Sequence, residues 1–357
     1  MEEFMTLAFT SVGVPQKDAE ICAAVLIESD KRGIDSHGVA RFKPFYIDRI
    51  KEGVQNPVTK FDIVREGFTT AVVDGNHGMG HLIGVKSMEL AIEKAKKYGM
   101  AMVAVRNSTH YGIAGYYASM AADAGMIGIT GTNARPSIAP TFGVENMLGT
   151  NPLTIGIPTD EDFSFILDCA TSISQRGKVE QHARLNKQMP EGWVIDNNGN
   201  PVTDANVALA GFATGDCALA PLGGIGEELA GYKGFGYATA VEIMSAALQS
   251  GLFLKALNGF GPNGEKRPFG IGHFFIAIDI NAFIDLDEFK HNSGQILREL
   301  RASMSAPGQE RIYTAGEKEY LAYLERKETG IPMNEAVQKS LQAARDELKL
   351  DFKFIWE

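Results

Sequence analysis

The chain has 357 residues, of which 45% are hydrophobic and 22% charged, values typical of a globular protein with a core of ordinary size. Its 34 basic and 44 acidic residues give a net charge of -10, which argues against general nucleic-acid binding, because that function needs a basic surface. The length predicts roughly two to three domains, or one domain with large elaborations.

The amino-terminal stretch MEEFMTLAFT carries acidic residues where a secretory signal would carry basic ones. No apolar run along the chain reaches the roughly 18 residues that suggest a membrane span. The three cysteines, Cys22, Cys169 and Cys217, lie far apart and form no C-x-x-C pair. We therefore expect a cytoplasmic protein with free thiols, no membrane contact, no disulfide framework and no cysteine zinc site.

Hydrophobic periodicity and turn residues predict alternating helices and strands in the first third of the chain. Pro15 and Gly33 bracket the first helix, and Pro44 interrupts or tilts the second. In chain order, the predicted elements are a helix at 15–32, a second helix at 39–53, a strand hairpin at 61–75, a helix at 83–99, a strand at 100–108 and a loop running into a helix at 109–125.

The rest of the chain predicts more strands, an irregular region and a helical tail. The segment 186–232, rich in Gly, Pro, Asn and Asp, is expected to be a long irregular loop, and such loops often form lids or binding surfaces. The tail from Asp285 onward is charged and helical through three segments. The other predicted elements are strands at 126–133, 163–171 and 273–280 and a helix at 236–251.

This order of elements, helical, then mixed, then helical again, predicts an α/β protein with a helical layer built from both chain ends. We expect a discontinuous helical domain formed by residues 1–59 with 285–357. Residues 60–284 are expected to form the α/β domain that carries the sheet.

Two patterns resemble ligand motifs but fit turns better. GFGPNG, residues 259–264, matches G-x-G-x-x-G, yet no clear strand precedes it and no helix follows. His77 and His81 have a spacing that suits metal binding on a helix, but Gly78 and Gly80 lie between them and no H-E-x-x-H is formed. We expect turns at both places and no metal site.

The stretch DSHGVARF, residues 35–42, places a hydroxyl, an imidazole and a guanidinium between two helical patterns. His37 suits proton transfer to a carbonyl oxygen, and Arg41 suits a bidentate grip on a carboxylate. Four residues separate them, so one helical turn can place both at one pocket. A polar capping loop is the alternative interpretation. A Ser-His-Asp hydrolase would use the same residue types, but the adjacent Ser36 and His37 make its geometry awkward.

Three later stretches combine small and polar residues at strand ends or before helices. His110, in NSTHYGIAGYY, fits a ligand contact and a structural histidine equally well. DCATSISQRGK, residues 168–178, offers hydroxyls, N–H groups and cations for a phosphate, or a common Ser/Thr-rich cap. Its Asp168 could fix the tautomer of an imidazole. GYKGFGYA, residues 231–238, fits a Gly-rich linker better than a second anion-binding loop.

Together and in this order, the motifs resemble the malate/L-lactate dehydrogenase family of NAD(P)-dependent oxidoreductases, which is unrelated to the Rossmann-type lactate and malate dehydrogenases. The similarity spans about residues 30–320, and no single motif is specific by itself. The matching stretches are DSHGVARF, HYGIAGYYA, GMIGITGTN, APTFG, LGTNPLTIGIP, FILDCATS, GKV, MPEGWVIDNNGNPVTD, APLGG, YKGFG and TAGEKE.

The resemblance implies a homodimeric cytoplasmic enzyme that binds NAD or NADP on its α/β domain, through a sheet that is not of the Rossmann kind. It implies that His37 exchanges the proton with Ser36 and Asp168 orienting it. It also implies that Arg41 holds the substrate carboxylate and that His110 lines the pocket. Cofactor contacts are implied at Ala170, Thr171, Ser172, Lys233 and Gly234 and near Gly316 and Glu317. Lys178 is a further candidate, because its charge could meet a phosphate of the cofactor.

The chain departs from the family pattern at places that concern the substrate. The insertion IGEELAG before YKGFG is longer than in many members, and Arg135 stands where members vary, so its charge could select the substrate. A malate- or lactate-like acid is the expected substrate, with NAD and NADP both open as cofactors. The alternatives are a reductase of a cyclic imine or a keto-sugar acid, a hydrolase, and a non-catalytic binding protein.

Overall fold

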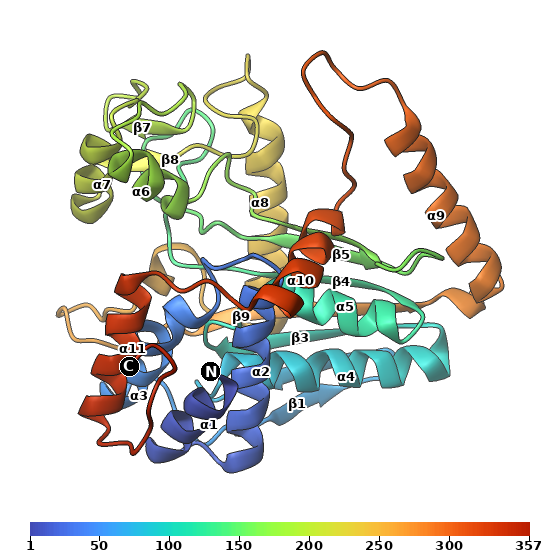
Figure 1. Cartoon of the computed structure of the whole chain (residues 1–357), viewed down its shortest axis with the longest axis horizontal. Coiled ribbons are helices and arrows are strands. Elements are labelled where there is room, and N and C mark those ends of the chain that lie inside the picture. The colour runs from blue at the N-terminus through green and yellow to red at the C-terminus, as the bar shows by residue number, and fades with distance from the viewer.

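The computed structural model describes residues 1–357, and a seven-stranded sheet forms its centre (Figure 1). Its strands are β1 (Asp62–Glu66), β2 (Thr70–Asp74), β3 (Met100–Ser108), β4 (Met126–Thr132), β5 (Leu153–Ile157), β6 (Phe165–Cys169) and β9 (Ile271–Asp279). The strand order is β1-β2-β3-β9-β4-β5-β6, and β2 with β3 is the one parallel pair. This order differs from the doubly wound parallel sheet of Rossmann folds, and it confirms the predicted α/β class.

Helices and a small second sheet, β7 (Val194–Asp196) with β8 (Cys217–Leu219), surround the central sheet. None of the helices combines the length and apolar character that crossing a lipid bilayer requires. The α-helices are α1 (Glu2–Ser11), α2 (Gln16–Lys31), α3 (Asp48–Lys51), α4 (Gly80–Tyr98), α5 (Ala114–Asp123), α6 (Arg176–Arg184), α7 (Ala205–Thr214), α8 (Gly231–Ala246), α9 (Leu286–Ala302), α10 (Glu317–Thr329) and α11 (Glu335–Glu347).

The central sheet is covered on both faces. α4 and α5 pack on the face to which Phe275 and Ala277 of β9 point, and these residues share one buried core with both helices. Because successive residues of a strand point to opposite faces, Gly272 and Phe274 lie on the other face of the sheet, where α8 packs. A Cβ on Gly272 would lie 1.7 Å from the carbonyl oxygen of Ser245, so only glycine lets α8 approach the strand this closely.

Both chain ends contribute to one helical layer, but α9 lies outside it. Leu341 and Ala344 of α11, with Phe354, are buried in the same core as Phe4 of α1 and Leu26 of α2. Figure 1 shows the termini close together at this layer, whereas α9 runs along the other side of the molecule. The division into 1–59 with 285–357 and 60–284 stays a prediction.

Most predicted elements of the central sheet are confirmed, and the main errors lie in the segment 186–232. This segment is not irregular throughout, because it contains α7 and the antiparallel pair of β7 and β8. The signals for α7 are local: the Asp204 carboxylate caps it by accepting from the N–H groups of Asn206 and Val207, and Gly215 ends it in the left-handed region. GYKGFG is also not a linker, since it forms the first turns of α8.

Candidate active site

The loop that carries Ser36 and His37 follows α2 and leads into three short helical turns. These are a 3₁₀ turn η1 (Val39–Arg41), a π-helical turn η2 (Lys43–Ile47) and α3. π-Helical turns are rare and occur often at functional sites. Pro44 lies inside the π-helical turn, which agrees with the predicted interruption of this helix.

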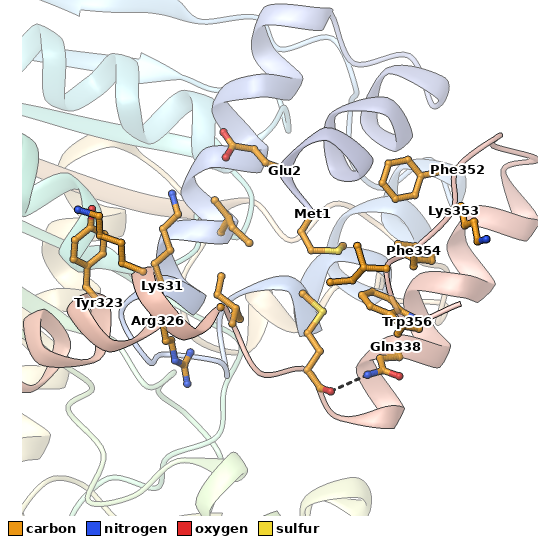
Figure 2. Close-up of a pocket in the computed structure, with 16 residues that line it drawn as sticks. Met1, Glu2, Lys31, Tyr323, Arg326, Gln338, Phe352, Lys353, Phe354 and Trp356 are labelled. Carbon is orange, nitrogen blue, oxygen red and sulfur yellow. Dashed lines mark hydrogen bonds between the residues drawn. The ribbon is translucent and has the colours of Figure 1, made fainter.

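Polar contacts of Asp30 and Arg326 hold this loop in place. The buried Asp30 carboxylate accepts a hydrogen bond of 2.7 Å from the Val39 N–H, and a Cβ on Gly38 would lie 2.1 Å from the same carboxylate. Arg326 of α10 pairs with Asp35 and donates to the Asp30 carbonyl oxygen. Figure 2 shows Arg326 at the edge of a cavity of about 840 Å³ that both chain ends line and that contains neither His37 nor His110.

The loop brings His37 against His110, which lies between β3 and α5. The two imidazole rings stack with their centroids 5.8 Å apart. The Ser36 hydroxyl lies 2.8 Å from His37 Nδ1, and the Tyr46 hydroxyl lies 2.5 Å from His110 Nδ1. The Gly112 N–H also donates to His110 Nδ1, at 3.3 Å, so this nitrogen is an acceptor and the proton of the neutral ring is on Nε2.

Both histidines are held as neutral imidazoles at physiological pH. Burial, with the nearby charge of Arg41, lowers the pKa of His37 to about 4. Burial also lowers the pKa of His110 well below its usual value, and the neighbouring His37, His81, Arg49 and Arg41 lower it further. Neutral His37 is in the form that accepts a proton, which is the form that the oxidation of an alcohol requires.

A row of residues at four-residue spacing, 37, 41, 45 and 49, lines one side of this site. The Arg41 guanidinium lies 4.9 Å from the centroid of the Phe45 ring, and its Nε donates to the Ser36 carbonyl oxygen at 2.6 Å. The Arg49 guanidinium lies 4.4 Å from the same ring. Phe45 in turn packs edge-on against His110, with centroids 5.2 Å apart. The sequence contained this periodicity, yet the prediction stopped at Arg41 and missed Phe45, Tyr46 and Arg49.

Asp168 does not contact His37, contrary to the expectation that it orients this imidazole. Its two carboxylate oxygens accept hydrogen bonds from the Gly115 N–H at 2.7 Å and from the Thr154 hydroxyl at 2.9 Å. Both partners belong to elements that flank β6, so each oxygen of the Asp168 carboxylate has a hydrogen-bond donor next to this strand. A Ser-His-Asp triad is therefore not assembled from Ser36, His37 and Asp168.

The residues implied for the cofactor lie in three groups around β6. Ala170, Thr171 and Ser172 follow the strand directly, and the Thr171 carbonyl accepts from the Leu222 N–H at 2.8 Å. Gly234 packs on Leu222 so closely that a Cβ would lie 2.3 Å from its carbonyl oxygen. The structure thus brings the first turn of α8, with Lys233, beside the end of β6.

The third group, Gly316 and Glu317, lies along the outer edge of β6. A Cβ on Gly316 would lie 2.8 Å from the Ser164 carbonyl oxygen, and Gly316 and Asp168 line one cavity of about 240 Å³. Glu317 is buried and forms ion pairs with Arg301 and Arg311, so its carboxylate is already engaged. Lys178 lies on the exposed side of α6, and Arg135 is exposed as well.

Replacing Asp30 with asparagine should change how stability depends on pH. Burial raises the pKa of Asp30 to about 7, with the Val39 N–H and Arg326 opposing this and Asp35 adding to it. Because the folded state binds this proton more tightly than the unfolded state, Asp30 makes the protein less stable as pH rises from about 4 to about 7. The Asp30→Asn protein lacks this loss, so its stability relative to wild type should improve by about 2 kcal/mol between pH 5 and pH 8.

Urea unfolding at both pH values measures this change, with Asp18→Asn on the same helix as the control. Equal pH slopes for the wild-type and Asp30→Asn proteins would contradict the prediction.

Known proteins similar to this chain share nearly its whole length. The sequence model of the malate/L-lactate dehydrogenase family matches residues 1–342. The malate dehydrogenase of Pyrococcus horikoshii is 44% identical over 338 residues, which cover 95% of this chain and 91% of that protein. The L-sulfolactate dehydrogenase of Methanocaldococcus jannaschii is 40% identical over 341 residues, with 96% and 93% covered. Among solved structures, the malate dehydrogenase of Entamoeba histolytica gives a TM-score of 0.94 at 46% identity, covering 99% of this chain and 97% of that one.

Proposed function

The chain belongs to the malate/L-lactate dehydrogenase family, and from this premise we propose that it transfers a hydride between NAD or NADP and C2 of a small, malate-like 2-hydroxy or 2-oxo acid. The observation that carries the proposal is the stacked pair His37 and His110 beside the Arg41 guanidinium. This arrangement offers a proton carrier and a carboxylate anchor at one place, which are the two groups that reduction of a 2-oxo acid needs from the protein.

In this proposal, His37 takes the proton from the C2 hydroxyl during oxidation and returns it to the carbonyl oxygen during reduction. The Ser36 hydroxyl, 2.8 Å from His37 Nδ1, fixes the orientation of the ring and leaves Nε2 for the substrate. Arg41 holds the substrate carboxylate through its free guanidinium nitrogens. Asp168 acts indirectly, because it anchors the start of α5 just after the His110 loop.

The residues around β6 fit a nicotinamide cofactor. The Ser172 and Ser174 hydroxyls are buried without a hydrogen-bond partner beside the end of the strand, so they are available for the polar groups of a ribose or a phosphate. We assign the cofactor contacts to the end of β6, to Lys233 and Gly234, and to Gly316 with the backbone of Glu317 at the outer edge of the strand, because the Glu317 carboxylate is engaged by Arg301 and Arg311. When bound, the nicotinamide supplies or accepts the hydride at its C4 atom.

A cofactor oxidation assay tests this function. The protein is mixed with NADH or NADPH and with oxaloacetate, pyruvate, sulfopyruvate, a keto-sugar acid or a cyclic 2-carboxy imine, and absorbance at the nicotinamide band is followed. We expect oxidation of at least one cofactor, fastest with oxaloacetate or sulfopyruvate. If the cofactor is oxidised only with the imine or only with the keto-sugar acid, that compound class would replace the malate-like acids as the substrate. No oxidation with any acid, together with hydrolysis of an activated ester, would contradict a dehydrogenase function.

Light scattering on the same preparation tests the oligomeric state. We propose that the enzyme works as a homodimer in the cytoplasm. A mass of one 38.6 kDa chain by light scattering at the assay concentration would contradict the dimer.

A further inference from the structure

Arg49 is a half-buried guanidinium that has no acidic partner. It lies between two aromatic rings, 4.4 Å from the centroid of Phe45 and 4.3 Å from that of Phe269. No carboxylate lies within ion-pair distance of it. Other arginines of low exposure are paired with acids, as Arg301 is with Glu161 and Arg326 with Asp35. A cation that is removed from water without a partner is costly, so this position is poised for an anion.

Further positive charge surrounds Arg49. Arg41 lies over the same Phe45 ring, and its only side-chain hydrogen bond goes to a backbone carbonyl. Burial lowers the pKa of Arg49, and the charges of Arg135 and Arg41 lower it further. Glu52 opposes this effect, but its carboxylate is paired with Lys266 at 2.7 Å. The guanidinium groups of Arg41 and Arg49 therefore share the Phe45 ring, and neither is paired with a carboxylate.

We propose that Arg49 binds a second anionic group of the substrate and that Arg135 adds positive charge to this region. Arg41 follows His37 by one turn and takes the carboxylate next to the reacting carbon, while Arg49 lies two turns further on and takes the distal group. The substrate class is then a dianionic 2-oxo acid, with two carboxylates or with a carboxylate and a sulfonate. This inference rests on the proposed function, since Arg41 must hold the carboxylate next to C2.

Kinetics with a dianion and a monoanion test the proposal. In Arg49→Met, which keeps the stem between the two rings, the KM for oxaloacetate should rise about 10- to 100-fold, the usual effect of losing one charge-assisted contact. The KM for pyruvate should stay within about two-fold, because pyruvate has no distal anion. Arg49→Lys should recover part of the loss for oxaloacetate, and Arg135→Gln should raise the same KM by a smaller factor. Arg65→Gln on exposed β1 is the matched control and should change neither KM.

A binding measurement separates this inference from the proposed function. Succinate carries two carboxylates and propionate one, and neither can be reduced. Succinate should raise the melting temperature of the wild-type protein more than propionate does, and Arg49→Met should abolish that difference. This readout holds even if no cofactor is oxidised. Equal losses for oxaloacetate and pyruvate, or equal shifts with succinate and propionate in the wild-type protein, would overturn the assignment of Arg49.

Discussion

Replacing His37 with alanine should lower the turnover of the 2-oxo acid by about 100- to 10,000-fold, the range in which a positioned proton donor contributes. His37 lies at the centre of the site: its ring stacks on His110, its Nδ1 lies 2.8 Å from the Ser36 hydroxyl, and Arg41 follows four residues later. His291→Ala, at an exposed histidine on α9, is the control and should leave turnover unchanged. Turnover within a few-fold of wild type for His37→Ala would remove this residue from the reaction.

The pH dependence of the same enzyme should differ between the two directions. In the free protein the pKa of His37 is about 4, because burial and the Arg41 charge both disfavour the imidazolium. The kcat/KM for oxidation needs the neutral ring, so it should stay level from neutral pH down to about 5 and fall near pH 4. The kcat/KM for reduction needs the protonated ring and should fall as pH rises. In His37→Ala, the residual activity should lose both dependences.

Chemistry carried by neighbouring residues could be predicted from the sequence. Ser36, His37 and Arg41 lie within six residues, and Arg41 Nε donates to the Ser36 carbonyl oxygen, so their mutual arrangement is set locally. The strand MAMVAVRNS is β3 with the expected bounds, because a continuous apolar run bounded by turn residues is a strong local signal. The approach of His110 to His37 needed the whole fold, and the sequence analysis left a structural role for it equally open.

The errors have a common physical origin in contacts between elements that are distant in the chain. Asp168 carries the right chemistry for an imidazole, but its place on β6 gives its oxygens to Gly115 and Thr154. Tyr46 and Arg49 were missed because their roles depend on contacts with His110 and Phe269, which are distant in the chain. β5 was missed because LTIGI is short and its fourth residue is a glycine.

Substitutions at His110 should show which of its two nitrogens acts in the reaction. His110 Nδ1 accepts from the Tyr46 hydroxyl and the Gly112 N–H, so Nε2 carries the proton of the neutral ring. A glutamine amide reaches the position of Nε2, whereas an asparagine amide reaches only that of Nδ1. His110→Ala and His110→Asn should each lower turnover by about 100-fold or more, while His110→Gln should keep about ten times more activity than either.

Tyr46→Phe completes this test, because it removes the hydroxyl without removing the ring. Loss of one neutral hydrogen bond to His110 should lower turnover by about ten-fold. The rate of reduction should still fall as pH rises, since His37 still provides the proton. Steady-state kinetics across pH on the four variants provide the measurement. If His110→Gln loses the pH dependence and His37→Ala keeps it, the two histidines exchange roles, and the proton passes through His110 with Tyr46 behind it.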